Sequence, residues 1–258
     1  MKKRTLAFAA PVVAGACLYL GLSSTTTIAQ KAEERTGPDV KIETGTKPKP
    51  SPAAAAVERM AMAHSLAKYG RQAKSPTALI AAAEILGAIP TTPLEAKPEH
   101  RRDEKSASAA GSQAEERSRG PKARNNDDPA SLLAEAKQMA PNDPDVAAIV
   151  ERAARALEER PRGAVGGPQR GVHVVSAHSF DRFVLSFRAG ERAIVALSGD
   201  GSTDLDLLIA DQDGNPIAKD DDDSDDCIVN WIPKWTGPFL ILVRNLGSEA
   251  NRYVIETN

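Results

Sequence analysis

Two kinds of hydrophobic spacing divide the chain. From Pro52 to about Leu157, apolar residues recur three and four positions apart, which is typical of helices that pack along one face. From about Gly171 the spacing falls to two, which is typical of strands. The chain is therefore predicted to be multidomain, with a small α-helical hairpin or bundle region followed by an antiparallel β-sandwich.

Four helices are predicted in the first part, over about 52–70, 75–87, 128–139 and 143–157. The last three each begin with an N-cap residue followed by a proline at the first helical position, as in Ser75-Pro76. His64 falls on the apolar face of the first helix together with Val57 and Met60. We interpret His64 as a packed histidine rather than a ligand.

Seven or eight short strands are predicted in the second part, over about 173–175, 183–187, 193–197, 204–209, 227–232, 239–243 and 252–256. Turn sequences such as Gly199-Asp200-Gly201 and Asp213-Gly214-Asn215 separate them. Many short strands with frequent turns indicate a sandwich rather than a sheet covered by helices.

Three segments show neither spacing. Residues 30–51 are rich in Lys, Thr and Pro and are predicted to be a disordered tether. Residues 90–127 are polar and contain prolines, and they are predicted to be a disordered insert in a helical region spanning 52–160. Residues 161–170 are predicted to link that region to a sandwich domain at 171–258.

The N-terminus has the pattern of a secretory leader. Met1-Lys2-Lys3-Arg4 is basic, an apolar run follows, and small residues at Thr27 and Ala29 fit a cleavage site. Residues 1–29 are therefore predicted to be a signal peptide, and the protein to be secreted or periplasmic. Lipidation at Cys17 and retention of the segment as an anchor remain alternatives. After cleavage no apolar run is long enough to span a membrane.

Charge and aromatic content narrow the possible functions. Lys and Arg number 33 and Asp and Glu 35, so the net charge of −2 does not support nucleic-acid binding. Aromatic residues make up 4% of the chain, and seven of the ten lie beyond residue 179. The helical part is therefore lightly packed, and a single large globular enzyme is excluded.

The most distinctive charge pattern lies between Asp200 and Asp226, where eleven Asp and one Lys give a local charge of −10. Such density requires solvent or a cation to offset the repulsion. Calcium is the candidate cofactor, because it prefers carboxylate oxygens. The candidate ligands are Asp204, Asp206, Asp220, Asp221, Asp222, Asp223, Asp225 and Asp226. The spacing is not that of an EF-hand, and a solvated acidic turn remains the alternative.

Two further side chains in this part stand out. Cys227 alternates with Val229 and Trp231, so we expect a buried and unreactive thiol. Trp235 lies beside Lys234 and before a Thr-Gly pair, so we expect it to be exposed and take it as a candidate ligand-binding residue.

Five short motifs follow one another in residues 171–258: Thr203-Asp204-Leu205-Asp206-Leu207, Asp211-Gln212-Asp213-Gly214-Asn215, Trp231-Ile232-Pro233, Thr236-Gly237-Pro238-Phe239 and Asn251-Arg252-Tyr253-Val254. Their order resembles that of the bacterial pre-peptidase C-terminal (PPC) domain. The resemblance implies a jelly-roll-like sandwich that is itself non-catalytic and is appended to secreted peptidases and other exported proteins. Some members bind calcium or matrix polymers.

The chain departs from this family in two respects. It has no upstream peptidase domain and neither a Gly-x-Ser-x-Gly nor a His-Glu-x-x-His motif. Residues 161–171 contain no acid, so the linker calcium site of collagen-binding relatives is not carried over.

These patterns favour an exported, non-catalytic protein whose sandwich is a binding or accessory module at the cell envelope. Its partner would be a protein or polymer of the envelope or the extracellular space. A regulatory or inhibitory partner of a separately encoded secreted peptidase is one alternative. A hydrolase with an unrecognised site is another, and it would require His173, His178 and Asp side chains to converge in a cleft.

Overall fold

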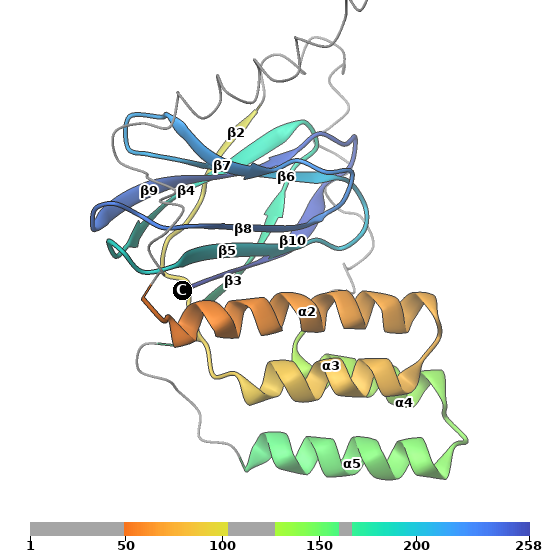
Figure 1. Cartoon of the computed structure of the whole chain (residues 1–258). Helices are drawn as coiled ribbons and strands as arrows, with labels where there is room; N and C mark the ends of the chain where they lie inside the picture. The colour runs from red at the N-terminus through yellow and green to blue at the C-terminus, as the bar shows by residue number, and fades with distance from the viewer. Residues whose placement is uncertain (1–48, 103–126, 160–166) are drawn as a thin grey trace, which may run out of the picture. The chain divides into compact units, whose positions relative to one another are not determined.

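The computed structural model describes residues 49–102, 127–159 and 167–258 (Figure 1). The predicted leader and nearly all of the predicted tether lie outside these residues. None of the described helices is long and apolar enough to cross a membrane.

Four helices occupy the predicted positions: α2 (Pro52–Gln72), α3 (Pro76–Ala88), α4 (Pro129–Met139) and α5 (Pro144–Glu158). Each begins in the same way, with proline in the first turn and a Ser or Asp side chain before it that accepts a backbone N–H of that turn. The start signals in the sequence therefore located these helices correctly.

The helices share one apolar core, built mainly from alanine and leucine. Its largest fully buried members are Met60, Leu79 and Leu132, which come from α2, α3 and α4. Small side chains let the helices approach closely. At Gly70, for example, an added Cβ would lie 3.0 Å from the Leu79 side chain.

The β-sandwich consists of two sheets. Sheet C has the order β1-β3-β10-β5-β8, and sheet D has the order β2-β4-β9-β6-β7. The strands are β1 (Thr92–Pro93), β2 (Glu99–Arg102), β3 (Gln169–Val175), β4 (Ser179–Phe187), β5 (Ala193–Ser198), β6 (Leu205–Ala210), β7 (Pro216–Asp220), β8 (Asp226–Trp231), β9 (Gly237–Asn245) and β10 (Asn251–Thr257). From β3 to β10 every pairing is antiparallel, and this order of strands is that of a jelly roll.

The core of the sandwich lies between the two sheets and follows the predicted alternation. Phe183, Ile241 and Tyr253 are fully buried there. Cys227, Val229 and Trp231 point into the same core, as predicted. The predicted fold class, helices followed by a jelly-roll-like sandwich, is confirmed.

One ordered segment contradicts the predicted insert at 90–127. Residues 92–93 pair with β3 of sheet C, and residues 99–102 pair with β4 of sheet D, so this segment, the strap, adds one strand to an edge of each sheet. Leu94 and Ala96 of the strap pack against the sandwich core. The prediction failed because the order comes from distant strands, which local periodicity does not reveal. Residues 103–126 of the predicted insert lie outside the described residues.

Two smaller corrections concern strand limits. β3 begins at Gln169, inside the predicted linker, and β7 was not predicted. The five residues of β7 include a proline and a lysine and have no buried side chain, so they carry little strand signal.

Helix α2 lies on the outer face of sheet C (Figure 1). Ala54 and Val57 of α2 pack against Ile194 and Ala196 of β5, and all four side chains are buried. Strand β5 is therefore covered on both faces, which explains why residues 193–197 are all apolar.

Candidate functional site

A network of buried and half-buried charged side chains lies where α2 packs on sheet C. His64 lies at the centre of this contact and is 2% exposed. Its Nδ1 donates to Asp127 Oδ2 at 3.0 Å, and its Nε2 donates to Glu256 Oε1 at 2.9 Å. Burial lowers the pKa of the ring, but the two carboxylates outweigh burial and raise the pKa of His64 to about 9. His64 is therefore a buried imidazolium that joins α2, the start of α4 and β10.

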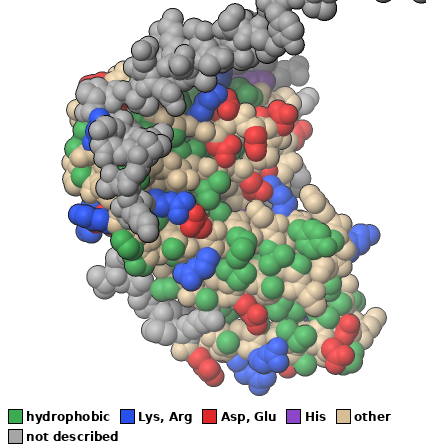
Figure 2. Space-filling model, viewed as in Figure 1, with side chains coloured by type: hydrophobic (Ala, Val, Ile, Leu, Met, Phe, Trp, Pro, Cys, Tyr) green, Lys and Arg blue, Asp and Glu red, His purple; other side chains and the backbone are tan. Residues whose placement is uncertain are grey.

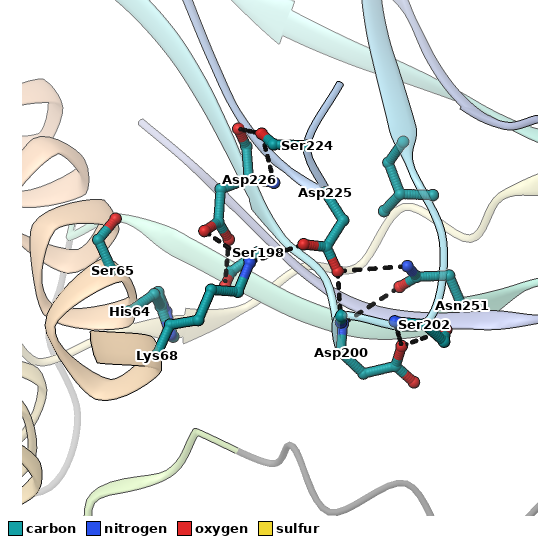
Figure 3. Close-up of polar contacts among 12 residues, drawn as sticks. His64, Ser65, Lys68, Ser198, Asp200, Ser202, Ser224, Asp225, Asp226 and Asn251 are labelled. Carbon is teal, nitrogen blue, oxygen red and sulfur yellow. Dashed lines mark hydrogen bonds and ion pairs between the residues drawn. The ribbon is translucent and has the colours of Figure 1, made fainter. Parts of the chain in front are cut away.

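Lys68, one turn further along α2, binds two carboxylates at the start of β8. Its Nζ lies 2.6 Å from Asp225 Oδ1 and 2.7 Å from Asp226 Oδ2 (Figure 3). Burial opposes the charge on Lys68, yet the hydrogen bonds that its ammonium donates to both carboxylates raise the pKa of Lys68 above the usual range. Ser198 of β5 donates to the other oxygen of Asp226 at 2.9 Å.

Asp225 is held from several directions. Its Oδ2 accepts the Gly201 N–H and the side-chain amide of Asn251 (Figure 3). The backbone of Gly199 passes so close that an added Cβ would collide with the Asp225 carboxylate. The turn between β5 and β6 therefore fixes the position of one of the two carboxylates that bind Lys68.

Two arginines extend the network at its ends. Arg71 of α2 binds Asp127 at 2.7 Å and Glu135 of α4 at 3.0 Å. Arg170 of β3 lies 3.5 Å from Glu256. We call His64, Lys68, Asp127, Asp225, Asp226 and Glu256 the interface cluster.

Sequence reasoning singled out three members of this cluster, His64, Asp225 and Asp226, but not as parts of one network. His64 was correctly expected to be packed, but Lys68 and Glu256 were not singled out. Two clues were available in the sequence. Glu256 is an acid that follows the apolar Val254 and Ile255, and Lys68 lies four positions after His64, on the same face of the helix.

The eight candidate calcium ligands have different surroundings. Asp225 and Asp226 bind Lys68, Asp221 pairs with Lys219, and Asp220 Oδ2 accepts the Ile228 N–H at 2.8 Å. Asp222 caps the turn by accepting the Ser224 N–H at 3.0 Å. Figure 2 shows acidic side chains gathered on part of the sandwich surface.

Asp204 and Asp206, at the start of β6, lie among these acids. Burial, followed by the charges of Asp223 and Asp222, raises the pKa of Asp204. Burial and the charge of Asp204 likewise raise the pKa of Asp206. The Leu205 N–H donates to the Ser224 carbonyl, so the acidic loop folds back against the start of β6 as the calcium hypothesis requires.

Side-chain cations already lie among these acids: Lys68 binds Asp225 and Asp226, and Lys219 binds Asp221. Within residues 49–102, 127–159 and 167–258, no group of three or more His, Cys, Asp or Glu side chains is arranged to hold a metal ion. Asp204 Oδ1 is buried without a hydrogen-bond partner in this part of the chain. Calcium binding by the acidic loop stays a prediction.

The expectation that Trp235 is exposed is wrong. Its ring stacks on Phe239, with centroids 6.0 Å apart and planes 18° apart, and it packs against the sandwich core. The reason for the error is that Gly237 leaves room for the ring, and a Cβ there would lie 3.0 Å from it.

A second polar group lies where the strap meets sheet D. His100 Nδ1 donates to Asp181 Oδ1 at 2.5 Å, and the Tyr253 hydroxyl donates to Asp181 Oδ2 at 2.6 Å. Burial and the adjacent Asp181 carboxylate raise the pKa of Tyr253. His173 stacks edge-on against Phe183, and burial lowers its pKa. This group fastens the strap across the edges of the two sheets.

Comparisons with known proteins concern the fold. No protein-family model and no curated protein matches the chain. Among solved structures, the chain is similar to the pre-peptidase C-terminal domain of a collagenase from Bacillus anthracis, at 10% identity and a TM-score of 0.29, over 39% of this chain and 99% of that one. This domain belongs to the family that the sequence motifs resemble.

A second similar structure is Aeromonas hydrophila PliG, a periplasmic inhibitor of g-type lysozyme. The identity is 15% and the TM-score 0.26, over 36% of this chain and 83% of that one.

Proposed function

We propose that the chain is an exported, non-catalytic protein whose sandwich is a binding or accessory module at the cell envelope or outside the cell. The interface cluster is the observation that supports this. Its buried ionisable side chains, His64, Asp127, Asp225 and Glu256, are each bonded to another protein group. A catalytic site needs at least one such group directed at a substrate. The cluster therefore serves to hold α2 on sheet C.

The leader pattern of residues 1–29 supports export to the periplasm or the medium. The partner is proposed to be a protein or a polymer of that compartment, and the near-neutral net charge gives no support to nucleic acid.

The experiment requires the full chain rather than the sandwich alone. A fragment beginning near residue 165 would expose Ile194 and Ala196 and would leave Glu256 without His64. Newly exposed apolar surface would bind envelope components non-specifically.

The test is to fractionate cells that express the full chain, crosslink it to its neighbours, and reconstitute the recovered contact from purified components with and without calcium. The expected result is an extracytoplasmic chain that binds one envelope component saturably. A purely cytoplasmic chain would overturn the proposal. So would hydrolysis of an ester, peptide or glycoside substrate that is lost in His173→Ala, because this result would support the hydrolase alternative. A recovered peptidase whose rate changes on binding would instead support the regulatory alternative.

A further inference from the structure

Strand β3, at the edge of sheet C, is paired along only part of its outer side. It pairs with β10 over its whole length, whereas β1 pairs on the other side with Gln169 and Arg170 alone. The strap leaves β3 at this point because Leu94 turns onto the sandwich core beside Gly171, where an added Cβ would lie 3.2 Å from Leu94. Among the described residues, no strand pairs with the outer side of residues 171–175, which we call the open edge.

The backbone groups of Val172 and Val174 point to the open edge. The Leu94 N–H donates to the Arg170 carbonyl on this side at 2.9 Å, and groups that face one side recur at every second residue of a strand. No described strand or side chain bonds to Val172 or Val174 on this side. The Val174 side chain is 47% exposed on the outer face of the sheet. Unpaired groups of this kind are a template for a strand from another chain.

The other sheet edges carry features that oppose such pairing. Strand β7 begins with Pro216 and contains Lys219. On β8 the Ile228 N–H is already bonded to Asp220 Oδ2, at 2.8 Å. All four residues of β2 are charged or polar. The open edge at 171–175 contains no proline, lysine or acid, so it lacks these protections.

Sheet D has a strand at the place where sheet C lacks one. The two sheets stack in the same order, since β3 contacts β4 and β8 contacts β7. Strand β2, which lies beyond β4, is therefore opposite the place beyond β3. Residues 176–178 join β3 to β4, so the start of β4, where β2 pairs, lies opposite the end of β3. A strand added at the open edge would face β2 across the open end of the sandwich.

The inner side of β2 determines which side chains such a strand would meet. His100 and Arg102 pair with Asp181 and Ser179, which are buried in the sandwich, and directly paired residues share a face. His100 is bonded to Asp181 through Nδ1, and 64% of its side chain is exposed. The Arg102 side chain has no hydrogen bond or ion pair within the described residues. A carboxylate on the inner side of an added strand would therefore find an available guanidinium.

We propose that the open edge of β3 binds an extended segment of a partner protein in which carboxylate and apolar side chains alternate. The backbone of this segment pairs with Val172 and Val174, its apolar side chains adjoin these two valines on the outer face, and its carboxylates face Arg102.

This inference names a kind of partner for the sandwich and so rests on the proposed function. The two can fail separately. A failure of the tests below would remove this edge as the binding surface without affecting export, whereas a cytoplasmic chain would overturn the proposed function without bearing on the edge.

The first test measures the binding of a short synthetic peptide of alternating valine and glutamate to the full chain by calorimetry. The matched control is the same peptide with lysine in place of glutamate. The glutamate peptide is expected to bind saturably with a Kd below about 1 mM, and the lysine peptide at least about 10-fold more weakly. Amide hydrogen exchange at Val172 and Val174 is expected to slow on binding, because these groups become bonded.

The second test uses variants of the full chain. Val174→Pro removes an N–H that points to the open edge and leaves the bonds to β10 in place, so it is expected to weaken binding at least about 10-fold. Val174→Thr keeps this N–H and is the matched control. Arg102→Glu is expected to reverse the preference between the two peptides, whereas Arg101→Glu, the same charge change on the outer side of β2, should keep it. Circular dichroism and the thermal midpoint establish that each variant is folded.

Binding of the glutamate peptide that Val174→Pro weakens and Arg102→Glu reverses supports the proposal. Absence of binding at about 1 mM peptide overturns it, and so does binding that Val174→Pro leaves unchanged. Two results would assign the edge to another occupant and would also overturn the proposal. Exchange at Val172 and Val174 that is already slow in the free monomer would indicate a segment of the same chain. A dimer in sedimentation that is lost in Val174→Pro would indicate a second copy.

Discussion

His64 offers the sharpest test of the link between the helices and the sandwich. The folded state raises its pKa from 6.5 to about 9, through hydrogen bonds to Asp127 and Glu256 that outweigh burial. A pKa raised in the folded state means that folding takes up a proton between those values. Stability from this site is therefore complete below about pH 6.5 and is lost as the pH rises through about 9.

The magnitude follows from the shift. Each pKa unit corresponds to about 1.4 kcal/mol, so the site contributes about 3 kcal/mol at low pH. Stability is expected to fall by about 1.4 kcal/mol per pH unit within that window. His64→Gln removes the imidazolium and leaves Asp127 and Glu256 close together in a buried site. This substitution is expected to cost about 3–5 kcal/mol at pH 6, with a smaller difference from the wild type at pH 9.5.

The assay is urea unfolding of the full chain and of His64→Gln at half-unit steps from pH 6 to pH 9.5, because subtracting the two curves removes the titration of other groups. A histidine NMR titration gives the pKa directly. His173 serves as an internal reference, because burial lowers its pKa below the usual value whereas the pKa of His64 is raised. A His64 resonance that titrates near pH 6.5, or two stability curves that run parallel, would refute the reasoning.

Three further predictions concern the sandwich. Lys68→Met leaves Asp225 and Asp226 without the cation that they bind and is expected to lower the free energy of unfolding by about 1–3 kcal/mol, discounted for partial exposure, whereas Lys219→Met on the surface should leave it nearly unchanged. The buried Cys227 is expected to resist thiol reagents until the chain unfolds, and Cys227→Ser should cost about 1–3 kcal/mol; rapid native labelling would contradict its position in the core. If the acidic loop binds calcium, millimolar calcium but not magnesium should raise the thermal midpoint of the full chain, by about 2.7 kcal/mol at 100 times Kd, and Asp206→Asn should abolish the effect; an equal response to both ions would indicate screening alone.

The parts of the fold that the sequence predicted are those set by local interactions. An N-cap and a following proline define a helix start within four residues, as Asp128-Pro129 illustrates. In a strand with one buried face, buried and more exposed residues alternate. This pattern is present within β4 and β9 themselves, so both strands were recognised from their own residues. These signals require no knowledge of the partner element.

The parts that were missed depend on a distant partner. The strap residues 92–102 have no apolar period of their own and are ordered by β3 and β4, more than seventy residues away. Lys68 and Asp226 are likewise far apart in the sequence, and only the packing of α2 on sheet C brings them together. The charge count singled out the acidic loop, but it could not show that the ammonium of Lys68, from another element, binds Asp225 and Asp226.

The two sheets differ in what covers their outer faces. In β5 of sheet C, residues 193–197 are all apolar and are buried on both sides, because α2 covers the outer face of this strand. In β9 of sheet D the core positions are just as apolar, yet the outward positions include Leu240 and Leu242, and charge appears outward only at Arg244. The apolar outward positions of β5 are therefore explained by the cover that α2 provides, whereas among the described residues no helix packs over the outward leucines of β9, which are half-buried by their neighbours in the sheet.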